Sequence, residues 1–131
     1  MTALRSRVAL ILVLSVLVLP SAALAADTDG AFRTIGLQKE TSCASYMSAR
    51  DEGRKGDYHR ENTYLNWVLG YLTAYNRIKP NTYDIKGSSD VSALMLWLEN
   101  FCKTTPLYSF GDAVDELTTK LYAERIKVAP N

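Results

Sequence analysis

Cys43 and Cys102 are the only two cysteines of the chain, and their thiols are the first groups whose chemistry needs an assignment. In an oxidising compartment, two cysteines of a small domain usually form one disulfide, which stabilises the fold by constraining the unfolded chain. Two cysteines and one distant histidine do not supply the three or four converging ligands of a zinc site. We therefore predict a structural Cys43–Cys102 disulfide, no redox chemistry and no metal site.

His59 is the only histidine, and a neutral imidazole is the usual general base. It stands between Tyr58 and Arg60 in a charged stretch, which predicts a surface position in a loop between helices. No glycine-rich phosphate loop follows a strand. We expect no enzyme, no catalytic residue and no cofactor. Helical spacing scatters the carboxylates of the last segment over a solvated face: Asp112, Asp115, Glu116 and Glu124.

The first residues have the three parts of an export signal. Arg5 and Arg7 supply positive charge, the apolar run 8–19 follows, and Pro20 then leads to small residues around Ala25. A membrane-spanning helix needs about 20 apolar residues, so this run is too short for an anchor. We predict a signal peptide at 1–25, cleaved after Ala25, and a periplasmic or secreted protein.

The remainder of the chain is nearly neutral. It holds all 14 acidic residues, and 13 of the 15 basic ones once Arg5 and Arg7 are removed, so its formal charge changes from +1 to about −1. A nucleic-acid footprint would show as a clear excess of Lys and Arg. No second apolar run is long enough to span a membrane. We therefore expect neither nucleic acid nor membrane as a partner, and one small domain.

Apolar side chains recur at helical spacing in four segments, and none alternates with period two over strand length. The expected helices are 41–50, with charges that could extend it to 54, then 61–78, 90–103 and 109–125. Thr41 or Ser42, then Ser89 or Asp90, then Ser109 would cap the first, third and fourth. The prediction is an all-α, four-helix domain over 41–126 with one disulfide, between an irregular lead-in at 26–40 and a tail at 127–131.

Aromatic side chains concentrate on the two central helices. At helical spacing, Tyr and Trp usually pack inward with their polar atoms at the rim, but both are also enriched at protein interfaces. Trp67 and Trp97 fall off their apolar stripes and are the aromatic residues expected to be most exposed. Gly70 and Ala74, one turn apart, would let another helix approach closely. The candidate partner-contact residues are Trp67, Trp97, Tyr71 and Tyr75.

The order of these features resembles the HdeA/HdeB acid-stress chaperones. The resemblance rests on Cys43 near a first helix, a second helix with Trp67, and the stretch 101–106 (Phe-Cys-Lys-Thr-Thr-Pro) before Ser109 and a closing helix. It implies a small exported helical protein with one disulfide at these positions. In acid, carboxylates would lose charge while cations keep theirs, and self-repulsion would expose apolar faces that hold unfolded client proteins.

A second resemblance offers an alternative function. Gly70-Tyr71-Leu72, Trp97-Leu98 and the helix within 106–121 are also similar to the Tai-type immunity proteins of type VI secretion. Those are small, exported and helical, and each binds a toxin in the periplasm and blocks it. A third class is a structural or interaction protein related to neither family. In every case the expected partners are other proteins, with a homodimer left open.

Overall fold

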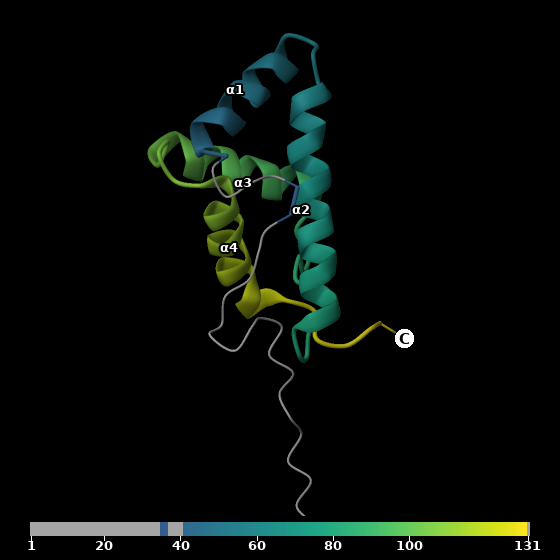
Figure 1. Cartoon of the computed structure of the whole chain (residues 1–131). Helices are drawn as coiled ribbons and strands as arrows, with labels where there is room; N and C mark the ends of the chain where they lie inside the picture. Colours follow the sequence, from purple (N-terminus) through teal and green to yellow (C-terminus); the bar gives the residue numbers. More distant parts are fainter. Residues whose placement is uncertain (1–34, 37–40, 131) are drawn as a thin grey trace, which may run out of the picture.

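The computed structural model of the protein describes residues 35–36 and 41–130. Within them the chain forms four α-helices and a closing 3-10 turn (Figure 1): α1 Cys43–Arg54, α2 His59–Ile78, α3 Val91–Thr104, α4 Phe110–Leu121 and η1 Tyr122–Glu124. Extended pairing in these ranges is limited to isolated bridges, Ser42 with Ser109 and Asp84 with Ile126. The predicted all-α, four-helix fold is confirmed. The predicted signal peptide, 1–25, and nearly all of the lead-in, 26–40, lie outside the described residues.

Three of the helices begin with side-chain caps at residues that the sequence indicated. Ser42, Asp90 and Ser109 each accept a hydrogen bond from the backbone amide three residues further on, at 3.2, 2.7 and 3.0 Å. Each bond satisfies a donor that the start of a helix leaves without an intrahelical partner. Local sequence therefore sets these three starts.

Two helix ends differ from the expectation, and α1 takes the longer of its two expected lengths. α2 begins at His59 rather than Glu61, because the Asp57 carboxylate accepts a hydrogen bond from the His59 amide (3.2 Å). The histidine is exposed, as predicted, but it lies in the first helical turn and not in a loop. α4 ends at Leu121, and one 3-10 turn replaces its expected last turn before Arg125 becomes extended.

The arrangement of the helices is organised around α2, the longest of them. Its 20 residues span about 30 Å, and Figure 1 shows α1 beside its N-terminal half, α3 crossing near the middle and α4 opposite its C-terminal half. α1 packs on both α2 and α3, and α4 packs on α3. The chain thus places α1 at one extremity of the molecule and the end of α2, with the C-terminal tail, at the other.

An aromatic trio forms the centre of the core. Tyr46 of α1, Tyr64 of α2 and Phe110 of α4 are buried, with ring centroids 4.7 to 5.2 Å apart. Tilted and edge-on rings at such distances interact favourably beyond their buried area. Aliphatic side chains continue the core along the helices: Val68, Leu72, Ile85, Leu94, Leu98, Val114 and Leu117.

The Cys43–Cys102 disulfide joins the first residue of α1 to the last turn of α3, across 59 residues of sequence. Both cysteines are fully buried. In the loop-entropy account, a crosslink over this length stabilises the fold by roughly 4 kcal/mol. Beside it, the Cys43 amide donates to the carbonyl of Tyr108 (2.8 Å) and the Phe110 amide to that of Thr41 (2.7 Å). The predicted disulfide is confirmed, and it anchors the N-terminus of α1.

The outer face of α2 is open. A side chain built at Gly70 would meet nothing within 4 Å, and Ala74 is exposed. Within the described residues, no other helix packs at these two positions, because α2 buries the opposite face through Tyr64, Val68 and Leu72. None of the helices in the described part of the chain combines the length and apolar character needed to cross a membrane.

Candidate functional site

The two tryptophans are less exposed than the sequence suggested. Trp67 and Trp97 are both partly buried and pack against the core, whereas Tyr58 and Tyr83 are more than half exposed. The expectation that the tryptophans would be the most exposed aromatic residues is wrong. Their rings lie at the edges of the helix interfaces, where a large flat side chain covers core atoms on one side.

Three of the candidate contact residues share one side of α2. Trp67 stacks on Tyr71 with ring centroids 5.5 Å apart. Tyr75 follows one turn later, and the centroid of its ring lies 5.9 Å from the Lys79 ammonium nitrogen. Burial raises the pKa of the Tyr71 hydroxyl, as does its hydrogen bond to Asp115 of α4. That bond fastens the C-terminal half of α2 to α4, so Tyr71 has a structural role whether or not a partner touches it.

Part of the lead-in lies over Trp67. The indole Nε1 of Trp67 donates a hydrogen bond to the backbone carbonyl of Ile35 (2.9 Å). Gly36 has a φ of +98°, and a side chain there would come within 2.9 Å of the indole ring. Glycine is therefore suited to this position both by backbone conformation and by space. Ile35 and Gly36 thus lie against the nitrogen-bearing edge of the Trp67 indole.

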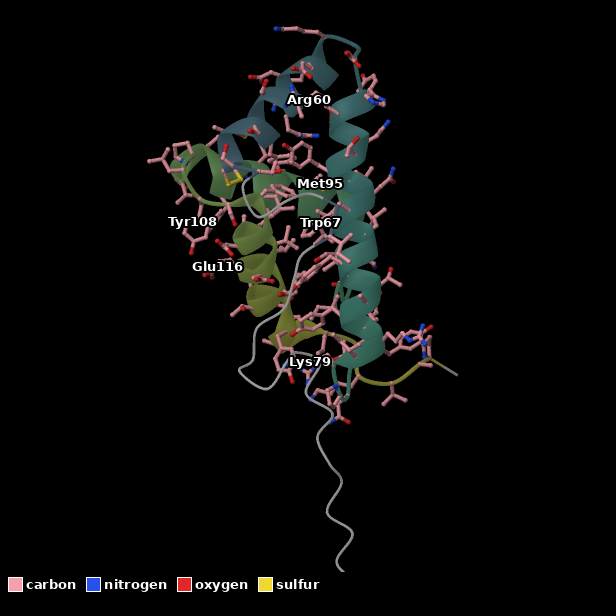
Figure 2. The ribbon with its side chains drawn as sticks, viewed as in Figure 1. Arg60, Trp67, Lys79, Met95, Tyr108 and Glu116 are labelled. Carbon is pink, nitrogen blue, oxygen red and sulfur yellow. A yellow bond between two sulfur atoms is a disulfide. The ribbon has the colours of Figure 1, made fainter. Side chains whose placement is uncertain are left out.

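The fourth candidate, Trp97, belongs to a separate aromatic row on α3. Its ring stacks on Phe101 at 5.2 Å, and Phe101 meets Tyr108 edge-on at 5.5 Å. Leu107, next to Tyr108, is 96% exposed. Figure 2 shows Tyr108 at the outer edge of the molecule, on the same side as Glu116. The aromatic row (Trp97, Phe101, Tyr108) with Leu107 forms an accessible apolar corner at the α3–α4 connection.

A buried carboxylate that lies at the centre of a group of ion pairs was not identified from the sequence. Glu99 of α3 is 3% exposed, and its carboxylate accepts hydrogen bonds from Arg50 (2.8 and 3.1 Å), from Lys103 (2.7 Å) and from Arg54. Arg50 also pairs with Glu61 of α2. This ion cluster (Arg50, Arg54, Glu61, Glu99, Lys103) connects the C-terminal half of α1 to α2 and α3.

The charges around Glu99 control its ionisation. Burial alone would raise the pKa of the carboxyl group, but the hydrogen bonds from Lys103 and Arg50 and the nearby guanidinium groups outweigh burial. The pKa of Glu99 falls from its ordinary 4.5 to about 2. In the folded protein, Glu99 therefore stays charged through most of the acidic range.

The ion cluster lies close to the aromatic core. The hydroxyl of Tyr46 donates to the carbonyl of Met95, one turn before Glu99, at 3.0 Å. Burial raises the pKa of Tyr46, so the phenol remains neutral. The Glu61 carboxylate lies against Gly53, where a side chain would collide with it. The ion cluster and the aromatic trio are therefore connected through α1, which carries both Arg50 and Tyr46.

The sequence did contain a signal for Glu99. It follows Leu98 and precedes Cys102 on the apolar stripe of α3, four residues after Met95 and four before Lys103. A carboxylate on a buried helix face requires cationic partners. Lys103, four residues after Glu99 on the same helix, is such a partner and can be identified from the sequence. The arginines of α1 could be located only by the fold.

A shallow depression of about 510 Å³ lies between α1 and the end of α3, lined by Met47, Ser48, Asp51, Glu52, Lys103 and Pro106 among others. Its charges have both signs and no nucleophile faces it from a buried position. Within residues 35–36 and 41–130, no group of three or more His, Cys, Asp or Glu side chains is arranged to hold a metal ion.

Comparison with known proteins identifies no relative. The chain matches no protein-family model, no curated protein and no solved structure. Function must therefore be argued from the ion cluster, the aromatic surfaces and the disulfide.

Proposed function

We propose that the chain is an exported protein-binding protein that works as an acid-stress chaperone of the HdeA/HdeB kind. The observation that carries the proposal is the ion cluster, because it joins α1 to α3 through the Glu99 carboxylate, which acid can neutralise, and joins α1 to α2 through Glu61. At this cluster, a change of pH acts directly on the interface between α1 and α3, beside the aromatic core.

The sign of the pH effect follows from the lowered pKa of Glu99. Between pH 4.5 and 2 the unfolded chain binds a proton at this position and the folded protein does not. Falling pH therefore favours the open state. The contribution of Glu99 to folding is complete above pH 4.5 and lost near pH 2, and it amounts to about 3 kcal/mol.

The disulfide would decide which part of the protein opens. Cys43 stays fixed to α3 at the N-terminal end of α1, whereas Arg50 and Arg54, further along α1, depend on the ion cluster. Acid would therefore release the C-terminal half of α1 and leave its first turn in place. The uncovered side chains would include Tyr64 of α2, which packs against Tyr46 in the retained first turn, and they would offer an apolar surface to unfolded clients.

The direct test measures client protection and surface exposure over the same pH range. At pH 2 we expect the protein to suppress aggregation of an acid-denatured client and to bind an apolar-surface dye, and at neutral pH to do neither. Glu99→Gln should move the onset of both to higher pH. Glu116→Gln, at an exposed position on α4, is the matched control and should leave the onset unchanged. A wild-type protein that stays compact at pH 2 or fails to protect the client contradicts the proposal.

A second candidate function, a Tai-type immunity protein, is favoured by the partly exposed aromatic row, whose Tyr108 and neighbouring Leu107 are accessible. Trp97, Phe101 and Tyr108 with Leu107 are presented by the folded protein without any opening. Interfaces use such aromatic side chains as anchors. This function predicts that the protein binds, tightly and one to one at neutral pH, a toxin encoded by a neighbouring gene. Leu107→Asp should weaken that binding. Binding that is unaffected by Leu107→Asp, or absent, would remove this candidate.

A further inference from the structure

The same order of residues occurs twice in the chain, at positions that the fold brings together. Arg77-Ile78-Lys79 closes α2, and Arg125-Ile126-Lys127 opens the C-terminal tail. The amide of Tyr83, just after α2, donates to the Ile126 carbonyl at 2.8 Å, and the Ile126 amide donates back to the Asp84 carbonyl at 2.9 Å. These bonds hold the tail against the loop that follows α2, at the extremity opposite α1 (Figure 1).

Side chains of the two triplets also meet. The Tyr122 ring lies 5.4 Å from the Lys79 ammonium and 3.7 Å from the Arg125 guanidinium carbon, so one ring is shared by a cation from each triplet. Arg125 is held further by its hydrogen bond to the Asn81 carbonyl (3.1 Å). Figure 2 shows Lys79 at this end and Arg60 at the other. We call the surface formed by 77–79, Tyr83 and 125–128 the basic end.

The cations of the basic end lack acidic partners. Among the residues that the structure describes, Arg77, Lys79, Arg125 and Lys127 form no ion pair with a carboxylate. Asp84 in the adjoining loop pairs with Lys86 instead, at 3.5 Å. The basic end therefore presents a local excess of positive charge on a chain that is close to neutral.

Exposed aliphatic residues are adjacent to these cations in the sequence. Ile78 is 61% exposed and Val128 77%, and the nearby Tyr83 ring is 52% exposed. Membrane-surface proteins combine these residue types: aliphatic groups enter the boundary between headgroups and acyl chains, while Lys and Arg keep their ammonium and guanidinium groups at the phosphates. Tyrosine favours the same interfacial depth.

We propose that the basic end docks the protein on the surface of a bilayer that contains anionic phospholipid. Each Lys or Arg close to such a surface contributes about 1 kcal/mol. An acidic protein fits the observations less well, because protein interfaces concentrate their energy in apolar anchors that fill pockets, and here each aliphatic side chain is separated from the next by cations. We expected no membrane partner because no second apolar run is long enough to span a bilayer. Docking on the bilayer surface does not require a spanning segment. The proposal is independent of client binding.

Co-sedimentation with vesicles tests this docking. The exported protein is mixed with vesicles of phosphatidylcholine and phosphatidylglycerol, or of phosphatidylcholine alone. We expect binding only to the anionic vesicles, and weaker binding as salt is added. Lys127→Glu and Arg77→Glu, one from each triplet, should each weaken partitioning about tenfold. Lys55→Glu makes the same charge change on an exposed side chain at the end of α1, and it should change partitioning by less than about twofold.

The apolar part of the surface has its own pair of variants. Val128→Ser should weaken partitioning about threefold and leave the salt dependence unchanged, whereas Leu96→Ser, at an exposed position on α3, should have no effect. Equal losses for Lys127→Glu and Lys55→Glu would show a general charge effect and overturn the proposal. Binding to polyglutamate but not to anionic vesicles would overturn it in favour of an acidic polypeptide. All variants share one N-terminus, so any residual apolar leader contributes equally to each.

Discussion

The cations that lie near the two ends of α2 differ in whether they pair with carboxylates. Near its N-terminus, Arg50 and Arg54 point into the ion cluster and Arg60 pairs with Glu52 at 2.6 Å. Near its C-terminus, Arg77, Lys79, Arg125 and Lys127 have no carboxylate partner among the described residues. Paired charges connect helices, at the first end around the buried Glu99, whereas cations without a carboxylate partner are available to another molecule. We therefore assign stability and pH response to the first end and surface recognition to the second.

Removing the disulfide should have the largest effect on the end that carries α1. Replacing both cysteines, Cys43→Ser with Cys102→Ser, should lower the free energy of unfolding by roughly 4 kcal/mol, because the unfolded chain loses a constraint that spans 59 residues. Urea denaturation of the variant and of the oxidised wild type measures the difference. Equal midpoints would show that the ion cluster and the core hold α1 without the crosslink.

Neutralising Glu99 should be next in size. Glu99→Gln leaves Arg50, Arg54 and Lys103 without their shared carboxylate, and we expect the free energy of unfolding at neutral pH to fall by about 3 kcal/mol. Stability should then depend less steeply on pH between 4.5 and 2, because the group with the lowered pKa is gone. Denaturation curves across this pH range give both quantities. If the pH dependence of Glu99→Gln matches that of the wild type, other carboxyl groups control acid opening.

The Tyr71 hydrogen bond lies between the two ends of α2 and should have an intermediate effect. Tyr71→Phe keeps the ring that stacks on Trp67 and removes the hydroxyl that donates to Asp115. A loss of about 1–2 kcal/mol is expected, since the acceptor is a carboxylate. Thermal unfolding measures this loss, and Tyr83→Phe, at an exposed position, is the control and should be neutral. Equal behaviour of the two variants would mean that the Asp115 contact does not stabilise the fold.

Removing a cation from the basic end should change stability least. Lys127→Ala is expected to alter the free energy of unfolding by less than about 0.5 kcal/mol, because no carboxylate loses a partner. Lys103→Ala, which removes a cation from the ion cluster, should cost more, and the pair of variants compares the two ends directly. A larger loss for Lys127→Ala than for Lys103→Ala would reverse the assignment of roles.

Local sequence predicted the helices well because their signals are local. The caps at Ser42, Asp90 and Ser109 each act on an amide three residues away, and the apolar stripes repeat within single helices. The errors have tertiary causes. Trp67 is partly covered because Ile35 and Gly36 approach it from a distant part of the chain. Its distance from the apolar stripe of α2 could not reveal that contact.

By itself, the sequence determined the all-α class, the capped starts of three helices and the cysteine pair, since two cysteines in one small domain can form only one disulfide within the chain. Only the tertiary structure decided which charges on different helices are paired. Arg50 and Glu99 are 49 residues apart, and the triplets 77–79 and 125–127 lie on different elements. An ion pair depends on distances of a few ångströms and on burial, and these are set by how helices pack and not by order along the chain. The same residue types therefore became a helix connection at one end and an open surface at the other.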